Sequence, residues 1–238
     1  MNNKTVCIIG AMDCEVERLK SILKDVEEIH QGAFNIFKGK VSNKDVVVVK
    51  SGVGKVCGAV CTQLLIDKFH PNCIINTGVA GGIKQGMQIG DIVIAEKLVQ
   101  HDFDATAIGY AKGYICNNIN PQEPTYFYAD KNLNTELKKV ISEKLPKLKY
   151  HEGVIASGDM FISSNEKKKE LKKMFNAVAA EMEGAAIAHA ATLNEIPFVI
   201  IRALSDLADE DAGKGHLFKE KEAAEISAAA IEALLERI

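Results

Sequence analysis

Four acidic side chains border apolar segments of this sequence, in places where a carboxyl group can do chemistry. The Ala-rich run AVAAEMEGAAIAHAA, residues 177–191, is apolar enough to be core, yet it holds Glu181 and Glu183. Asp206 follows a second apolar run, and Glu15 lies where the first turn of a helix is expected. Carboxyl groups in different surroundings can divide between them the roles of general acid and general base. These positions therefore indicate a catalytic or ligand-binding site.

Each acid also has a purely structural interpretation. A carboxylate such as Glu183 or Glu15 near the N-terminus of a helix gains about 0.3–1 kcal/mol from the helix dipole. Asp206 would suit the N-cap of a following helix. The dipole accounts for one acid of the Glu181 and Glu183 pair but not for both. Glu181 is therefore assigned a structural or supporting role, while Glu183, Glu15 and Asp206 are candidates for chemistry.

Five polar or glycine-rich segments each follow an apolar run that predicts a strand, and ligands of α/β proteins bind at such strand ends. These segments are residues 10–15, 51–54, 77–82, 181–183 and 202–206. The glycines of SGVGKVCG fall at positions 52, 54 and 58, which does not fit the dinucleotide pattern G-x-G-x-x-G. The spacing of a phosphate-binding P-loop is also missing. The sequence therefore argues against a dinucleotide-dependent redox enzyme.

The elements that position these residues alternate between short apolar strands and longer amphipathic helices. Strands are predicted at Val6–Ile9, Val46–Val49, Cys73–Ile75, Ile92–Ala95, Val154–Ala156, Val178–Glu181 and Phe198–Ile201. Helices are predicted near Glu15–Val26, Val56–Phe69, Leu133–Lys144, Glu166–Met174, Ala185–Leu193 and Glu220–Leu235. Because the strands are continuously apolar, helices are expected on both faces of the sheet, which predicts an α/β protein with a three-layer α/β/α sandwich. No linker divides the chain, so residues 1–238 are expected to form a single domain.

Composition and charge argue against several classes of function. With 29 basic and 32 acidic side chains the net charge is −3, so no binding to nucleic acid or to an anionic membrane is expected. The apolar start is too short for a signal sequence or a membrane span, which favours a cytoplasmic protein. The six cysteines form no CxxC pair, so they are expected to be reduced core thiols without a metal. A small neutral or zwitterionic molecule is the expected partner.

Eight segments carry a resemblance that covers nearly the whole chain. They are IIGAMDCEVERL, SGVGK, NTGVAGG, GDIVIA, HDFDATAIGY, SGDMFI, AAEMEGAAIAHAA and VIIRALSDLAD, in this order. With these segments the sequence resembles the 5'-methylthioadenosine/S-adenosylhomocysteine nucleosidases. The resemblance implies a nucleoside phosphorylase-like fold with a central mixed sheet, and a homodimer that uses no metal or organic cofactor.

The same resemblance implies an activity. It is hydrolysis of the N-glycosidic bond of 5'-methylthioadenosine and S-adenosylhomocysteine, and of 5'-deoxyadenosine as a further substrate, to adenine and a 5-thioribose product. The reaction would serve methionine salvage and the recycling of S-adenosylmethionine by-products. The substrate partner is thus a small 5'-substituted adenosine.

The resemblance also implies a role for each residue of the site. Asp206 would hold the adenine amino group and protonate the purine, while Glu15 would be the general base for water. Glu183 would bind the ribose hydroxyl groups. The remaining substrate contacts and their supports would come from Met12, Val79, Phe161, Ile162, Met182, Arg202 and Ser205.

The chemistry of an N-glycosidic bond supports this division of roles. A purine leaves poorly unless it is protonated, and the sugar becomes an oxocarbenium-like cation. An acid at the purine and a carboxylate base beside the sugar therefore suit an inverting hydrolysis, by analogy with glycosidases. Burial behind the apolar run Phe198–Leu204 would raise the pKa of Asp206, as an acid needs. Glu15 is expected near solvent, where it would remain ionised.

Three departures from the family pattern concern the 5' end of the substrate more than the reaction. Val79 stands where serine is common, Ile108 where an aromatic residue is common, and Cys116 where proline is common. The irregular stretch Gly109–Pro124 is expected to be a lid or a partner contact. The order of preference among methylthioadenosine, adenosylhomocysteine, 5'-deoxyadenosine and aminodeoxyfutalosine is left open.

Two other functions remain open from the sequence. A purine nucleoside phosphorylase of the same fold needs cations to hold phosphate. Here the first loop offers Asp13 and Glu15, and TGVAGG has no basic residue before Lys84, so water is favoured. A non-catalytic nucleoside-binding protein would need neither Glu15 as a general base nor Asp206 as a general acid. Release of adenine separates that alternative from an enzyme.

Overall fold

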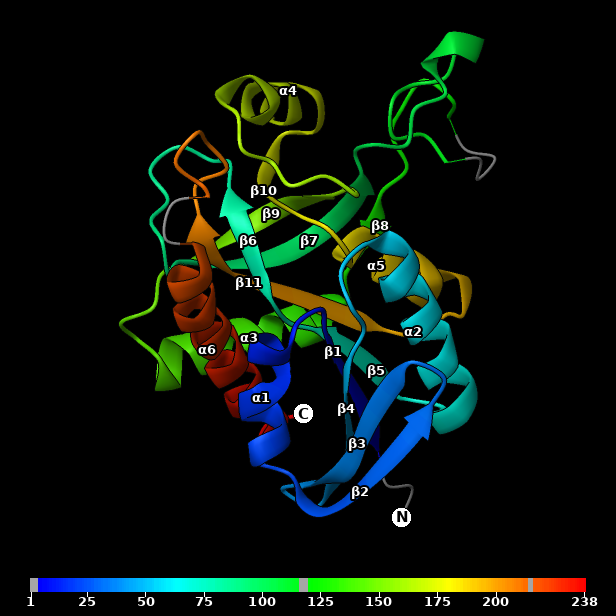
Figure 1. The fold of residues 1–238 in the computed structure, drawn as a ribbon, viewed down its shortest axis with the longest axis vertical. Helices are drawn as coiled ribbons and strands as arrows, with labels where there is room; N and C mark the ends of the chain where they lie inside the picture. Colours follow the sequence, from blue (N-terminus) through cyan, green and yellow to red (C-terminus); the bar gives the residue numbers. More distant parts are fainter. Residues whose placement is uncertain (1–3, 116–119, 214–215) are drawn as a thin grey trace.

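One mixed sheet of eleven strands runs through the molecule (Figure 1). The structure is a computed structural model that describes residues 4–115, 120–213 and 216–238. The strands are β1 (Thr5–Gly10), β2 (Lys24–Gln31), β3 (Phe34–Val41), β4 (Lys44–Lys50), β5 (Cys73–Asn76), β6 (Val79–Gly82), β7 (Ile92–Gln100), β8 (Phe127–Tyr128), β9 (Tyr150–Ser157), β10 (Ala177–Glu181) and β11 (Phe198–Asp206). Their order in the sheet is β2-β3-β4-β1-β5-β11-β6-β10-β9-β7-β8.

The sheet combines parallel and antiparallel pairs. β1 runs parallel to β4 and β5, and β11 runs parallel to β5 and β6. β11 also pairs antiparallel with β7, and β10 pairs antiparallel with β6. At one edge β2, β3 and β4 form antiparallel hairpins. The mixed sheet that the family resemblance implied is therefore confirmed.

Helices cover both faces of this sheet. They are α1 (Asp13–Ser21), α2 (Lys55–Phe69), α3 (Lys131–Lys144), α4 (Asn165–Phe175), α5 (Gly184–Leu193) and α6 (His216–Leu235). α2 packs against α5 on one face, and α6 packs against α1 and α3 on the other (Figure 1). α4 packs against β9 and β10. The predicted three-layer α/β/α sandwich is confirmed.

Strand β1 shows why a central strand can be apolar along nearly its whole length. Cys7 and Ile9 belong to the core on the side of α2 and α5, whereas Val6 and Ile8 belong to the core on the side of α1, α3 and α6. Successive side chains of a strand point to opposite faces. Because both faces are covered, every position of β1 from Val6 onward is buried, and the sequence reads as one apolar run.

The first predicted helix was too long, and the hairpin after it was missed. The helix predicted near Glu15–Val26 ends at Ser21, and residues 24–31 form β2 instead. β2 lies at the edge of the sheet and is almost wholly exposed, so its sequence KDVEEIHQ lacks the alternation that marks a half-buried strand. Its pairing with β3 determines the structure there. The other five helices lie where they were predicted, with small shifts at their ends.

Two of the segments expected after strands lie within strands. Residues 79–82 of the TGVAGG segment form β6. β11 continues past the predicted end at Ile201 and includes Arg202, Ser205 and Asp206, all of them buried. The register of β11 against β6 shifts between Leu204 and Asp206. An irregular strand therefore carries the last group of site residues into the interior.

The described cysteines are free, as expected for reduced thiols. Burial raises the pKa of the Cys61 thiol to about 12, so this side chain behaves as an apolar core residue. Cys116 lies outside the described residues. Within the described parts of the chain, no helix has both the length and the apolar character needed to cross a bilayer.

Candidate active site

A cavity of about 210 Å³ brings together most of the residues that the sequence singled out. From the predicted set it is lined by Met12, Glu15, Val79, Phe161, Met182, Glu183, Ser205 and Asp206. Ile162 lines a smaller neighbouring cavity, and Arg202 lies behind the wall, where it pairs with Glu181. Residues far apart in the sequence thus form one site.

Glu15 is held in this cavity by backbone groups. Its Oε2 accepts hydrogen bonds from the N–H of Ala11 at 2.6 Å and of Met12 at 3.0 Å. Its Oε1 accepts one from the N–H of Val79 at 3.0 Å. Met12 is the N-cap of α1, so the start of this helix and the start of β6 together fix the carboxylate.

The expectation that Glu15 lies near solvent was wrong. The residue is only 3% exposed, because β6 and the loop before α1 enclose it. Burial raises the pKa of Glu15, although Arg202 and the three N–H donors act to lower it. A carboxylate with a raised pKa is a stronger base, and the best general base titrates near the working pH. Burial therefore strengthens the case for Glu15 as the base.

Gly78 allows β6 to approach this carboxylate. A methyl group built on Gly78 would lie 2.5 Å from Glu15 Oε1. That distance is too short for any side chain, so the approach that brings the Val79 N–H to Oε1 requires glycine. The glycine in NTGVAGG is thus explained by contact with the carboxylate.

Glu183 lies at the turn between β10 and α5. It occupies the N-cap position of α5, but its side chain makes no capping hydrogen bond. Oε1 instead accepts the N–H of Gly54 at 2.7 Å, which ties the turn to the loop before α2. Burial, followed by the negative charge of Glu181, raises the pKa of Glu183 to about 8. The carboxyl group therefore titrates near neutral pH.

Glu181 forms a buried ion pair with Arg202, at 2.5 Å between Oε2 and a guanidinium nitrogen. Both side chains are 2% exposed. Burial acts to raise the pKa of Glu181, but Arg202, the Ser157 hydroxyl and the Gly184 N–H together outweigh it and lower this pKa. Glu181 is therefore the ionised acid of the pair that it forms with Glu183, and its contacts agree with the structural or supporting role expected for it.

Asp206 faces the cavity from the end of β11 and is 4% exposed. Its Oδ2 accepts a hydrogen bond from Ser205 Oγ at 2.9 Å, and its Oδ1 accepts one from the N–H of Ala208 at 2.8 Å. A methyl group built on Gly81 would lie 2.8 Å from Oδ1, so β6 approaches this carboxyl group closely too. The N-cap interpretation was wrong, because α6 begins only at His216.

Apolar side chains line the part of the site around Asp206. The smaller cavity, of about 30 Å³, is bounded by Gly81, Met160, Phe161, Ile162, Ala180, Glu181, Met182 and Asp206. Phe161 is 46% exposed, so its ring lies at the mouth of the site. This cavity adjoins the one of about 210 Å³ and shares Phe161, Met182 and Asp206 with it, so the two together offer a flat aromatic ligand an apolar surface with an acid at its edge.

No lysine or arginine lines either of these cavities in the described part of the chain. The side chains that line them include the acids Glu15, Glu181, Glu183 and Asp206. Arg202 forms its ion pair with Glu181 from outside the cavity. Such a site disfavours a phosphate dianion and favours a cation or a developing positive charge. Among the described residues no cluster of His, Cys, Asp and Glu side chains suits a metal ion.

Sequence reasoning missed some residues of the site. Glu220 lines the cavity at 8% exposure and was not singled out, whereas Val53, which also lines it, lies in the singled-out segment 51–54 but was not named as a site residue. Ser157 and Asn76, which contact Glu181 and Arg202, end β9 and β5. Their position at strand ends is the signal that identified the other segments, and it would have found them.

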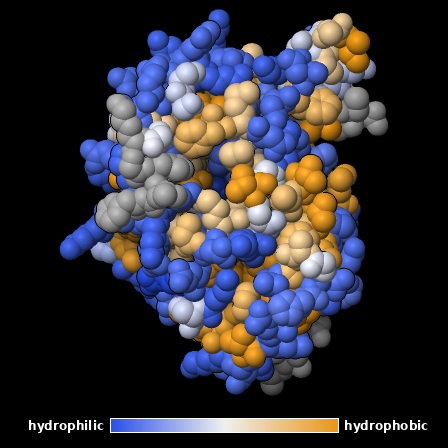
Figure 2. All heavy atoms as spheres, in the orientation of Figure 1, coloured by the Kyte–Doolittle hydropathy of each residue, from blue (hydrophilic) through white to orange (hydrophobic). Residues whose placement is uncertain are grey.

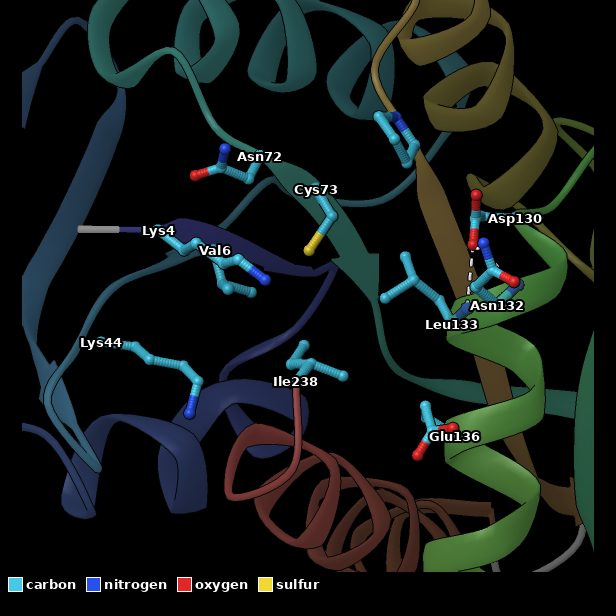
Figure 3. A pocket seen from close by; sticks show the side chains of 11 residues that line it. Lys4, Val6, Lys44, Asn72, Cys73, Asp130, Asn132, Leu133, Glu136 and Ile238 are labelled. Carbon is cyan, nitrogen blue, oxygen red and sulfur yellow. Dashed lines mark hydrogen bonds between the residues drawn. The ribbon is translucent and has the colours of Figure 1, made fainter. Parts of the chain in front are cut away.

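A larger cavity, of about 330 Å³, lies away from these carboxyl groups, among the starts of β1 and β5, α3 and the end of α6 (Figure 3). Three of the charged side chains that line it have structural partners. Asp130 accepts two N–H bonds at the start of α3, Lys44 donates to the Leu235 carbonyl, and Glu136 pairs with Lys139 and Arg237. None of the candidate residues lines this cavity, whereas Glu15, Glu183 and Asp206 all line the cavity of about 210 Å³.

The fold and the site define a class of protein. Residues 5–238 match the family described as the phosphorylase superfamily. The chain is 41% identical over 233 residues to the 5'-methylthioadenosine/S-adenosylhomocysteine nucleosidase of Staphylococcus aureus strain JH9, covering 97% of this chain and 99% of the relative. Within the superfamily, the chain belongs to the 5'-methylthioadenosine/S-adenosylhomocysteine nucleosidases.

Two solved structures are similar over their full length. The nucleosidase of that name from Neisseria meningitidis, in complex with methylthio-immucillin-A, has a TM-score of 0.92 and 39% identity, covering 99% of this chain and 100% of that one. Futalosine hydrolase of Helicobacter pylori strain 26695 has a TM-score of 0.92 and 33% identity, covering 99% of each chain. The family resemblance drawn from the sequence is confirmed.

Proposed function

We propose that this protein hydrolyses the N-glycosidic bond of 5'-methylthioadenosine and S-adenosylhomocysteine, releasing adenine and the 5-thioribose product. The observation that carries the proposal is the pair of buried acids Glu15 and Asp206 in one cavity that no basic side chain lines among the described residues. Residues 1–238 would act as one nucleosidase domain.

In this mechanism Asp206 is the general acid at the purine. Its carboxyl group lies beside the apolar wall of Phe161 and Ile162, where the flat purine would be held. Protonation of the purine turns a poor leaving group into a neutral one. Ser205, which donates to Oδ2, would keep the acid oriented.

Glu15 is the general base for water. Three backbone N–H groups fix its carboxylate beside Met12 and Val79, and burial makes it more basic than an exposed glutamate. Water that loses its proton to Glu15 attacks the sugar carbon from the face opposite the leaving purine. A positioned base contributes about 10²–10⁴ in rate.

Glu183 and Met182 hold the sugar. The Glu183 carboxyl group can accept hydrogen bonds from the ribose hydroxyl groups. With a pKa of about 8 it is ionised in part near neutral pH, and the ionised form also stabilises the positive charge of the oxocarbenium-like transition state. Arg202 stands behind this turn through its ion pair with Glu181.

A panel of substrates tests the proposal. 5'-Methylthioadenosine, S-adenosylhomocysteine, 5'-deoxyadenosine and aminodeoxyfutalosine are each incubated with the purified protein, and adenine is quantified. Release from the first two supports the proposal, whereas binding without release would make the protein a nucleoside-binding protein. The similarity to a futalosine hydrolase makes aminodeoxyfutalosine the second candidate substrate.

We also propose a homodimer that uses the surface of α2 and α5. Val56 on α2 is 73% exposed and Leu193 on α5 is 75% exposed, and hydrophobic side chains gather over α2 in Figure 2. Ile108, in the segment before Gly109–Pro124, is 73% exposed as well. Val56 and Leu193 line one surface hollow between α2 and α5, and exposed apolar surface of this kind is typical of protein interfaces.

Sedimentation at micromolar concentration tests the assembly. We expect a particle of twice the chain mass, and Leu193→Asp should give monomers because it buries a charge in the interface. Met174→Asp changes another exposed apolar residue, on α4 and 44% exposed, and should leave the dimer intact. A fully active monomer would contradict the proposal.

A further inference from the structure

Glu181 caps helix α5 from a position outside the helix. Its Oε2 accepts the N–H of Glu183 at 3.1 Å and of Gly184 at 2.7 Å. These are among the N–H groups that a helix start leaves without partners, and an anion there is favoured by the helix dipole. The ordinary capping residue at this turn would be Glu183, whose own side chain makes no capping bond.

Glu181 is itself fixed from two other strands. Its Oε2 accepts a hydrogen bond from Arg202 of β11, and Oε1 accepts one from the hydroxyl of Ser157 of β9. Ser157 Oγ in turn accepts the N–H of Ala185 at 2.7 Å, in the first turn of α5. The Glu181 carbonyl also accepts the N–H of Gly158, where the loop toward Phe161 begins.

We propose that Glu181 is a positioning residue: by capping α5 in place of Glu183, it releases the Glu183 carboxyl group from the helix start, so that this group faces the cavity and holds the sugar hydroxyl groups while its Oε1 accepts the Gly54 N–H. The proposal rests on the proposed function, because it assigns Glu183 the sugar. It also explains why two acids flank Met182: one is committed to the backbone, and the other is available to the ligand.

The charge of Glu181 gives the proposal a measurable consequence. The charged groups that act on Glu183 are Glu181 of β10, Arg202 of β11 and Glu15 of α1, together with the Gly54 N–H before α2. Glu181 raises the pKa of Glu183, and Arg202 lowers it. Removing the charge of Glu181 while Arg202 remains should therefore move this pKa downward from about 8.

The test is Glu181→Gln. The amide oxygen can still accept from Arg202 and from the two backbone N–H groups, and the amide nitrogen can donate to Ser157 Oγ, so the shape is kept and the charge is lost. A neutral amide accepts these hydrogen bonds more weakly than a carboxylate does, so the turn that carries Glu183 loses part of its support. We expect kcat/KM on 5'-methylthioadenosine to fall by about 10- to 100-fold, the range that a small misplacement costs. The pH profile of kcat/KM reports the ionisation of groups in the free enzyme. The step in this profile that is assigned to Glu183 should move to lower pH by at least about one unit.

Two further variants keep the outcome interpretable. Ser157→Ala removes one support but leaves the charge of Glu181, so it should lower kcat/KM without moving the titration. Asp91→Asn is the matched control: it changes an acid that is 6% exposed and bonded to His151, away from the cavity, and should leave kcat/KM unchanged. Melting curves give the folded fraction of each variant, and each rate is expressed per folded molecule.

A Glu181→Gln enzyme that keeps the wild-type titration and a kcat/KM within twofold of wild type would overturn the proposal. Should that variant fail to fold, an unchanged kcat/KM in Ser157→Ala would overturn it instead. Adenine release by the unaltered protein tests the proposed function separately. If that release is absent, the variants are compared by the pH dependence of their affinity for methylthio-immucillin-A, where the same downward shift is expected and its absence contradicts the proposal.

Discussion

Replacing Glu15 by glutamine removes the proposed base while changing the volume of the side chain very little. The structure determines how the amide would sit. Its oxygen can take the place of Oε2 and accept the N–H bonds of Ala11 and Met12. Its NH₂ group then faces the Val79 N–H, so one donor at this position loses its acceptor.

The effects on stability and on catalysis can be separated by their size. A buried donor without an acceptor costs about 1–3 kcal/mol, and removal of a buried carboxyl group offsets part of this cost. A domain with about 5–15 kcal/mol of stability therefore stays folded. Loss of a general base costs about 10²–10⁴ in rate, which is about 2.7–5.4 kcal/mol of transition-state stabilisation at 1.36 kcal/mol per factor of ten.

Single-turnover release of adenine from saturating 5'-methylthioadenosine measures the chemical step alone. We expect Glu15→Gln to slow this step by at least about 10². Methylthio-immucillin-A should still bind measurably, because the substitution leaves the proposed purine contact at Asp206 unchanged. A Glu15→Gln enzyme whose chemical step stays within a factor of ten of wild type, measured on folded protein, would refute the assignment of the base.

Three further predictions follow from the same geometry. Asp206→Asn should slow adenine release by at least about 10² while weakening binding less, since the amide keeps the shape but cannot deliver the proton. A rise in KM as large as the fall in kcat would contradict this. Gly78→Ala should reduce kcat, because the new methyl group would lie 2.5 Å from Glu15 Oε1 and must displace it; a full-rate enzyme would show that the contact is irrelevant. The raised pKa of Glu183 contributes stability below its ordinary value of 4.5 that is lost as the pH rises to about 8. Urea unfolding of Glu183→Gln should accordingly show a weaker loss of stability than wild type over that range, and parallel curves would contradict the pKa shift.

The sequence predicts the central elements of the fold because burial leaves a simple pattern. Both faces of β1 are covered, so its residues form a continuous apolar run that indicates a strand. β2 leaves no such pattern, because an exposed edge strand is specified by its pairing with β3 and its composition is that of a polar surface. The helix predicted near Glu15–Val26 was therefore extended into a strand.

The site could be located from the sequence more readily than its electrostatics. Acids at the ends of apolar runs identified Glu15, Glu183 and Asp206, and all of them line one cavity. The burial of Glu15 could not be predicted, because β6 encloses it only when Gly78 brings the strand close. The partner of Glu181 was likewise hidden, since Arg202 is far away in the sequence and meets it only through the pairing of the strands.

The most direct test of the account is the identity of the sugar product. The purified protein is incubated with 5'-methylthioadenosine in phosphate-free buffer containing a chelator, and again with phosphate added, and the products are separated by mass. We predict adenine and free methylthioribose in equal amounts in both reactions, since Glu15 is the proposed base for water and no basic side chain lines the cavity among the described residues. Adenine that forms only with phosphate, together with methylthioribose 1-phosphate, would contradict hydrolysis and identify a phosphorylase.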